Sequence, residues 1–369
     1  MVTILRRYWL AIVLGVAALL LVILLHPGDV PQQPAQQAEM HISGFYGGEK
    51  EQLVQDPEFQ KILKDKYNIV LDAQKLGSVE MAHPQPGLID KADFLWPSSS
   101  NVVALYDQAN LPKKKSQAVF NSPIVFYSWR EVTESLIKQG IVQKQGNATY
   151  IIDMPKFIRL VASSKSWSDI GVQGVTQQIS VRTTNPTQSN SGLLFACLMS
   201  SVLNGGQPVD ATSVQKVLPE LKLFFQHLGL KEASSADLFQ QYLTTGVGAK
   251  PLIAGYEAQI VSFVQQNAAY RDELVKTRTI LYPQPTVWSS HPVIARTANG
   301  VKLIDALLDP ELQKLAWKKH GFRPGVPGVK VNISDLNFPG LADEIKSVTD
   351  LPEPAVIDTI VSALTSSTP

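Results

Sequence analysis

The chain has 369 residues and a formal net charge of +1 at pH 7, with 33 basic and 32 acidic side chains. This balance gives no field that would attract nucleic acid or an anionic membrane face. Cys197 is the only cysteine, which excludes an intrachain disulfide, so the fold must rest on burial of a core. Roughly 330 residues follow the N-terminal segment, enough for one large or two medium domains.

The first residues predict a membrane anchor. Arg6 and Arg7 precede the uncharged apolar stretch 8–25. About 20 such residues span a bilayer core, whereas the apolar part of a secretory signal has about 7–15. The positive-inside rule then places the rest of the chain outside the cytoplasm. We therefore expect a single-pass protein of the cell membrane, with 1–26 as signal anchor and the Pro/Gln-rich segment 27–39 as linker. Cleavage within the linker is the alternative.

The extracytoplasmic part begins with alternating strands and helices. Residues 40–46 predict a strand that ends at Gly47-Gly48, and Asp56-Pro57 predicts the start of a helix. Further strands are expected at 67–72 and 92–96, each followed by a loop rich in Gly or Ser. This alternation predicts an α/β unit with a mostly parallel sheet, whose ligands collect at the carboxyl ends of the strands.

The middle and end of the chain predict more helices than strands. An apolar segment that follows the polar loop 184–192 and ends at Asn204 indicates a buried helix. Strands are expected at 122–129, 251–256 and 291–296. Helices are expected at 131–139, 156–163, 214–228, 237–243, 257–267 and 311–319. The polar tail 365–369 should fray.

The loop 184–192 favours a ligand site at the start of that buried helix. A helix N-terminus offers unpaired N–H groups and a partial positive charge. Ser189, Asn190 and Ser191 can add side-chain donors at the same point. This chemistry suits a small polar or anionic ligand. Plain N-capping by one of these side chains is the alternative.

Five segments of the chain together resemble segments of a known protein family. In chain order these are 93–95, 123–127, 182–192, 254–257 and 291–324. In this order they resemble the third strand, the first hinge strand, the oxyanion-binding loop, a strand bearing a ligand-facing Tyr, and a closing segment that ends in Gly-Phe-Arg-Pro. The family is that of the type 2 periplasmic, or extracellular, solute-binding proteins, which serve ABC importers. The resemblance covers residues 40–325.

The resemblance implies a two-lobed α/β clamp with mixed, mostly parallel sheets, flanking helices and two hinge strands. Lobe I would comprise 40–121 with 287–364, lobe II would comprise 122–286, and 365–369 would form the tail. The hinge strands would be 123–129 and 286–295. A solute would lie between the lobes and be enclosed when the hinge closes.

The resemblance also points to ligand contacts at strand ends and at the helix start. The predicted contacts are Ser43, Gly44, Gly77, Ser78, Ser98, Ser99, Ser189, Asn190, Ser191, Gly192 and Tyr256. The serines would donate from loops, and the tyrosine would reach across the cleft. An oxyanion is the favoured solute.

Three carboxylates near the predicted cleft leave the sign of the ligand open. Glu49, Glu80 and Glu257 would repel an anion unless they face away or pair with Arg130 or Arg182. A solute that bears an amine, or a chelated metal, is the alternative.

Catalytic and metal-binding motifs are missing from the sequence. It has no Gly-x-Ser-x-Gly, no His-Glu-x-x-His and no Cys pair, so we predict neither an enzyme nor a cofactor. A metal site built from His41 and His83 with Glu49 or Glu80 is conceivable but not favoured. The expected partners are a small polar solute and an ABC permease or another protein of a bacterial envelope. The alternative function is a sensory or protein-interaction module of the envelope that uses the same fold without transport.

Overall fold

The computed structural model describes residues 38–229, 231–336 and 338–365. The predicted anchor and nearly all of the linker lie outside this part, as does the tail beyond Thr365. None of the helices in the described part combines the length and the hydropathy needed to span a bilayer. From Met40 onward the chain forms one unit, which holds two β-sheets.

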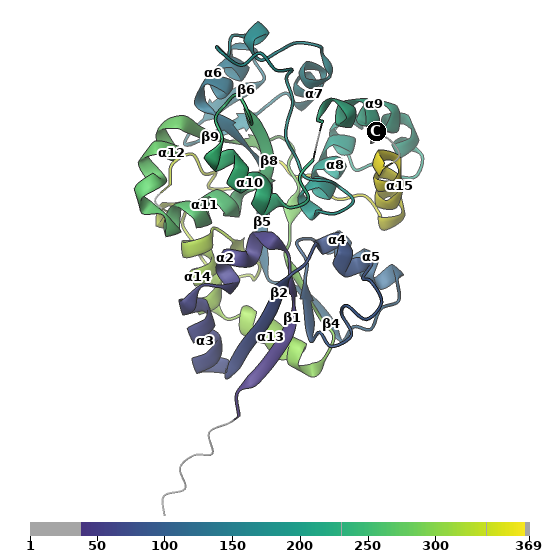
Figure 1. The fold of residues 1–369 in the computed structure, drawn as a ribbon, viewed down its shortest axis with the longest axis vertical. Coiled ribbons are helices and arrows are strands. Elements are labelled where there is room, and N and C mark those ends of the chain that lie inside the picture. Colours follow the sequence, from purple (N-terminus) through teal and green to yellow (C-terminus); the bar gives the residue numbers. More distant parts are fainter. Residues whose placement is uncertain (1–37, 230, 337, 366–369) are drawn as a thin grey trace, which may run out of the picture. The chain divides into compact units, whose positions relative to one another are not determined.

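The first sheet has five strands in the order β2-β1-β3-β11-β4. Figure 1 labels β1, β2 and β4 of this sheet in the lower part of the picture. Their bounds are β1 Met40–Tyr46, β2 Ile69–Lys75, β3 Phe94–Trp96, β4 Lys115–Ala118 and β11 Pro292–Ala295. β1 pairs in parallel with β2 and β3, whereas β11 runs antiparallel to β3 and β4. We call this sheet and the helices packed on it the first half of the unit.

Helix α3 (Pro57–Tyr67) forms where the sequence predicted a helix start. The Asp56 carboxylate accepts a hydrogen bond from the Glu58 N–H at 2.8 Å and so caps the helix. The helix ends at Asn68, whose φ of 55° is left-handed. The strand predicted at 67–72 therefore begins later, because Tyr67 still belongs to the helix.

The second sheet has seven strands, with β10-β5-β9-β7-β6 in order and β8 and β12 also paired to β5. Their bounds are β5 Phe120–Trp129, β6 Val142–Gln145, β7 Ala148–Ile151, β8 Leu252–Tyr256, β9 Arg278–Pro283, β10 Trp288–Ser289 and β12 Arg323–Pro324. Within the described residues only β7 and β9 pair in parallel, so the prediction of a mostly parallel sheet is wrong here. The reason is that β5 enters from the first sheet and runs opposite to each of its partners.

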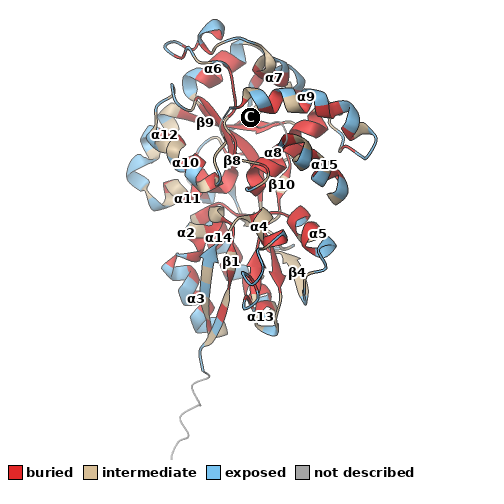
Figure 2. Cartoon of the chain, turned by 45° about the vertical axis from the view of Figure 1, so that its right-hand side comes forward, coloured by how far each residue is buried: buried red, intermediate tan, exposed pale blue. Residues whose placement is uncertain are grey.

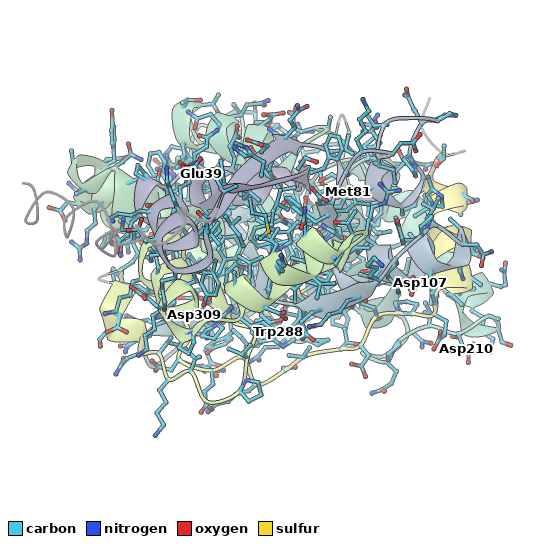
Figure 3. The ribbon with its side chains drawn as sticks, turned by 90° about the horizontal axis from the view of Figure 1, so that it is seen from below. Glu39, Met81, Asp107, Asp210, Trp288 and Asp309 are labelled. Atoms are coloured by element: carbon cyan, nitrogen blue, oxygen red, sulfur yellow. The ribbon has the colours of Figure 1, made fainter. Side chains whose placement is uncertain are left out.

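The helices divide between the two sheets. In the first half they are α2 Glu51–Val54, α3, α4 Ser78–Ala82, α5 Ser100–Gln108, α13 Ala298–Leu307 and α14 Pro310–His320. In the second half they are α6 Arg130–Lys138, α7 Met154–Ala162, α8 Asn190–Leu203, α9 Ser213–His227, α10 Ser235–Thr244, α11 Glu257–Gln266, α12 Arg271–Thr277 and α15 Pro354–Thr365. Single 3-10 turns are η1 Gly48–Lys50, η2 Ser168–Ile170, η3 Ala268–Tyr270 and η4 Ile333–Leu336. Asp309, labelled in Figure 3, caps α14 by accepting from the Glu311 N–H at 2.7 Å.

The chain crosses between the sheets at short segments. β4 ends at Ala118 and β5 begins at Phe120, so the first crossing is almost direct. The second crossing runs from Ser289 at the end of β10 to Pro292 at the start of β11, through His291 with a φ of 37°. The second crossing lies within the predicted hinge strand 286–295, whereas the first crossing precedes the predicted hinge strand 123–129. That these segments act as a hinge stays a prediction.

The C-terminal segment corrects the predicted extent of lobe I. Val356, Ile360 and Leu364 of α15 belong to the apolar core around α8 and α9, and Phe338 joins the core behind β8 and β9. Helix α15 and Phe338 therefore pack on the second half, whereas the segment at η4 also contacts α14 through a hydrogen bond from Trp317 Nε1 to the Asn332 carbonyl at 3.2 Å. The apolar side chains of α15 pack on the second half, because α3 and α13 already cover a face of the first sheet.

Candidate functional site

A small cavity lies where loops of the first half meet helix ends of the second half. Its volume is about 100 Å³. Gly47, Ser78 and Ser98 line it from the loops after β1, β2 and β3, and Asn190 and Tyr256 line it from the start of α8 and the end of β8. Drug-sized ligands occupy pockets of about 300–1,000 Å³, so this cavity suits a ligand of a few heavy atoms.

Several predicted contact residues line this cavity. They are Gly77, Ser78, Ser98, Ser189, Asn190 and Tyr256. Hydroxyl groups from distant parts of the sequence thus come together, and Ser78 Oγ lies 3.0 Å from Ser98 Oγ. That these groups contact a ligand remains a prediction.

Ser43 and Gly44 lie away from the cavity, and their prediction as contacts needs correction. Both belong to β1, which continues to Tyr46, so the loop after the strand begins later than these residues. The Ser43 hydroxyl donates to the Lys91 carbonyl at 3.0 Å. Gly44 packs so closely on Phe94 that an added Cβ would lie 2.3 Å from its carbonyl oxygen.

Ser99, Ser191 and Gly192 lie beside the cavity rather than in its lining. The Ser99 hydroxyl donates to the Asn190 side-chain oxygen and so joins the two halves. Ser191 Oγ lies 2.7 Å from Thr184 Oγ1. An added Cβ at Gly192 would lie 2.3 Å from the Thr184 carbonyl oxygen, so this glycine allows the loop to pack on the helix. These three residues therefore support the lining residues from behind.

The start of α8, where Asn190 lines the cavity, has free backbone donors. Ser189 is the N-cap residue, but its side chain makes no capping hydrogen bond, so plain N-capping does not account for this loop. In the described part of the chain the N–H groups of Asn190 and Ser191 have no acceptor, although both residues are 2% exposed. The helix is buried along nearly its whole length (Figure 2). The N-terminal end of α8 therefore carries partial positive charge where its residues are almost fully buried.

A buried charge cluster forms one wall, and the sequence analysis placed only its Glu49 near the predicted cleft, without the partners Lys50 and His291. Lys50 pairs with the Glu49 carboxylate, and both side chains are almost fully buried. Ser98 donates to Glu49 Oε1 at 2.5 Å, and His291 Nδ1 lies 3.3 Å from the same oxygen. The cluster thus joins the loop after β1 to the crossing between β10 and β11.

The protonation states in this cluster follow from burial and pairing. Burial alone would raise the pKa of Glu49, but the charge of Lys50 and the hydrogen bond to His291 outweigh it and hold this pKa well below its usual range. Burial lowers the pKa of His291 to about 4 despite the hydrogen bond to Glu49, so its ring is neutral at pH 7. A neutral ring bonded to a carboxylate donates from Nδ1. Nε2 of His291 has no partner among the described residues.

Tyr256 reaches the cavity from the second half. Its hydroxyl accepts a hydrogen bond from Asn190 Nδ2 at 3.0 Å. Burial, and next the charge of Glu49, raise the pKa of Tyr256 far above its usual range, so the hydroxyl stays protonated. Its ring packs against His291 with ring centroids 5.8 Å apart. The hydroxyl can therefore both donate and accept at the cavity wall.

Glu257 does not pair with Arg130 or Arg182. Its carboxylate instead binds Arg323 at 2.7 and 3.0 Å and accepts from the Tyr282 hydroxyl. These partners neutralise the charge of Glu257 away from the cavity. Glu257 would therefore not repel an anion that binds there. Arg130 and Arg182 donate to backbone carbonyls.

The metal site considered from the sequence is not assembled. His41 is exposed and pairs with Asp72 at 2.8 Å, whereas Glu49 faces Lys50 and His291. His83 follows α4 as its C-cap. No group of three or more His, Cys, Asp or Glu side chains suited to a metal ion occurs in the described ranges.

A second polar cluster joins the two halves behind the site. Ser262 Oγ lies 3.0 Å from His320 Nδ1, and His320 Nε2 lies 2.9 Å from Asp56 Oδ2. The residue types are those of a catalytic triad. However, the Ser262 hydroxyl donates to Gln52 Oε1 at 2.5 Å, and Asp56 is already the N-cap of α3. These contacts give the cluster a structural role between α11, α14 and α3.

Comparison with solved structures identifies the fold. The periplasmic binding protein P5PA matches with a TM-score of 0.58 and 12% identity, over 89% of this chain and 99% of that chain. AfuA from Actinobacillus pleuropneumoniae, with exogenous fructose-6-phosphate bound, matches at 0.56 and 12%, over 89% and 97%. The sulfate-binding protein SubI from Mycobacterium tuberculosis H37Rv matches at 0.52 and 15%, over 89% and 96%. The chain thus has the two-sheet α/β fold of type 2 periplasmic solute-binding proteins.

Sequence comparisons add nothing to this likeness. No protein-family model and no curated protein sequence matches the chain.

Proposed function

We propose that the protein is a solute-binding receptor that captures a small polar ligand between its two halves and delivers it to an ABC-type permease. One observation carries the proposal: polar side chains from both halves line a single cavity at strand ends and helix starts. Ligands of open α/β sheets bind at such places. The fold that the chain shares with periplasmic binding proteins supports the same function.

The groups at the cavity favour binding over chemical change of the ligand. Among the residues that line the cavity, the carboxylate of Glu49 could act as a base toward the Ser98 hydroxyl, from which it accepts a hydrogen bond at 2.5 Å. A carboxylate whose pKa is held well below its usual range is a weak base and would activate that serine poorly. We therefore propose a receptor and not an enzyme.

The proposed location follows from the N-terminal sequence. The apolar stretch 8–25 would hold the receptor at the cell membrane, with the part from Met40 onward outside the cytoplasm. Cell fractionation combined with protease treatment of intact cells tests this placement. Full-length chain in the membrane fraction, with its main part accessible from outside, is the expected result.

A thermal-shift screen of the full-length chain tests the proposed function. The panel would contain oxyanions, amino acids, sugars, polyamines and metal ions. A ligand present at 100 times its dissociation constant raises the free energy of unfolding by about 2.7 kcal/mol, which appears as a higher melting temperature. If no compound in the panel changes the melting temperature, the proposal fails.

Two serines on one helix give a matched pair of variants for any ligand that the screen finds. Ser189→Ala removes a hydroxyl that lines the cavity and should weaken binding by about tenfold at most. Ser200→Ala removes a buried hydroxyl that donates to the Cys197 carbonyl at 2.8 Å in the middle of α8. The second variant should bind as the wild type does. Equal effects of both would show that the cavity is not the binding site.

A further inference from the structure

One oxygen of the Glu49 carboxylate is left over for a ligand. The side chain is 4% exposed and lines the cavity. Lys50, Ser98 and His291 all contact Oε1. No side chain or backbone group of the described residues donates to Oε2. Oε2 keeps some access to the cavity, so a ligand that fills the cavity would cut this oxygen off from water, which is costly unless the ligand itself supplies a donor.

The loop before Glu49 holds this oxygen at the cavity. An added Cβ at Gly47 would lie 3.0 Å from both carboxylate oxygens and 2.7 Å from Ser98 Oγ. Only glycine therefore lets the carboxylate fold back over the loop. Because Oε1 is bound from three sides, the carboxylate cannot easily turn away from the cavity.

The start of α8 has the reverse preference at this cavity. The N–H groups of Asn190 and Ser191 at the start of α8 lack acceptors in the described part of the chain and favour negative charge. The Tyr256 hydroxyl adds a further donor. A ligand in this cavity thus meets the donors at the start of α8, the cation Lys75 and the charged acceptor Glu49.

We propose that Glu49 selects the ligand by requiring a hydrogen-bond donor on it, so that the site takes a small anionic group that carries a proton or an adjacent ammonium group. This inference rests on the proposed function and names the class of solute. Hydrogen phosphate and the smallest amino acids share this chemistry. Sulfate and acetate present acceptors only, so they would leave Glu49 Oε2 unpaired and repelled.

Two pairs of probes test this requirement by calorimetry on the full-length chain at pH 7. Phosphate and sulfate are similar in size, but only phosphate keeps a proton. Glycine and acetate share a carboxylate, but only glycine has a donor beside it. In at least one pair the compound with the donor should bind at least about 100-fold more tightly, because a site with a buried unpaired acceptor rejects analogues that lack the donor.

Variants at Glu49 assign the preference to this residue. Glu49→Gln replaces Oε1 or Oε2 by an amide that can donate, so the preference for the donor-bearing probe should fall at least tenfold. Because that change leaves Lys50 buried without its partner, the double variant Glu49→Gln/Lys50→Met removes both charges and preserves the packing. Glu58→Gln is the matched control, since it makes the same charge change on α3, where Glu58 pairs with Lys319 outside this cavity.

The outcomes separate this inference from the proposed function. Equal binding within each pair, or a preference that both Glu49 variants retain, would overturn the role of Glu49 while the receptor function stands. Failure of all four probes to bind would also overturn the proposed ligand class, and the wider screen would then decide the receptor function alone. Circular dichroism and melting curves of the double variant show whether it is folded.

Discussion

The Asn190→Ala variant gives a direct test of how the two halves are held together at the site. The Asn190 side chain accepts from Ser99 of the first half and donates to the Tyr256 hydroxyl at 3.0 Å. All three residues are almost fully buried. The amide thus forms a direct bridge between the halves at the edge of the cavity.

The size of the effect follows from these contacts. Each buried polar group left without its partner costs about 1–3 kcal/mol. Because the deleted amide borders the cavity, water can enter and replace part of what is lost. We therefore expect the free energy of unfolding to fall by about 1–3 kcal/mol in total, and not by the sum for both groups. If about 1.4 kcal/mol of this loss weakens the closed arrangement, ligand affinity falls about tenfold.

Urea unfolding and calorimetry with a ligand from the solute screen would measure the two effects. Asn204→Ala is the matched control, because this asparagine ends the same helix and donates to the carbonyls of Gln207 and Pro208 at 3.2 and 3.1 Å, away from the cavity. The control should lose stability but keep its affinity. Unchanged affinity in Asn190→Ala, or an equal loss in both variants, would refute the idea that this bridge supports binding.

Three further variants test the fold and the site. Asp309→Ala should lower the free energy of unfolding by about 1–2 kcal/mol at pH 7. Burial alone would raise the pKa of Asp309, but a hydrogen bond from Tyr67 helps to lower this pKa to about 2. The stabilisation by the ionised Asp309 is therefore present above the ordinary pKa of an aspartate and is lost as the pH falls through about 2. Urea unfolding curves of the variant and the wild type should converge at that pH. Phe126→Ala should lose about 3–5 kcal/mol in the same assay, because its ring is fully buried. Ser191→Ala should cost about 1 kcal/mol through its bond to Thr184 and should lower ligand affinity, measured by calorimetry, less than Ser189→Ala does, because Ser191 contacts the lining Ser189 without lining the cavity itself.

Local patterns in the sequence predict most of the helix starts and part of the site. Asp56-Pro57 and Asp309-Pro310 both open helices, because a capping carboxylate and a proline at the first turn act within a few residues. The polar loop before α8 correctly indicated a helix start with free N–H groups. Its helix begins at Asn190, however, so Ser191 and Gly192 lie inside the helix and pack on Thr184 instead of lining the cavity.

The sequence analysis did not predict how distant segments pack on one another. Such packing depends on the surface that a segment covers, and the sequence of the segment itself does not show that surface. The C-terminal helix α15 is apolar on one face, but nothing within it tells which half of the unit it covers. Its packing against α8 and α9 depends on which surfaces the rest of the chain has left uncovered. The direction of β5 relative to its neighbours is also set by where the chain enters the second sheet.

The cluster around Glu49 shows most clearly why a site of this kind is hidden in the sequence. Glu49 and Lys50 stand in a loop after Gly47-Gly48, where charged residues normally face water. Their burial depends on His291, which lies 241 residues further along the chain from Lys50 and reaches them only because the crossing to β11 passes beside the end of β3. A carboxylate in such a place gains its role from what surrounds it: three partners hold one oxygen, and the other oxygen is free to define what the cavity accepts. The sequence thus indicates that Glu49 lies near the cleft, but the role that we infer for it follows only from the partners that the two halves bring to it.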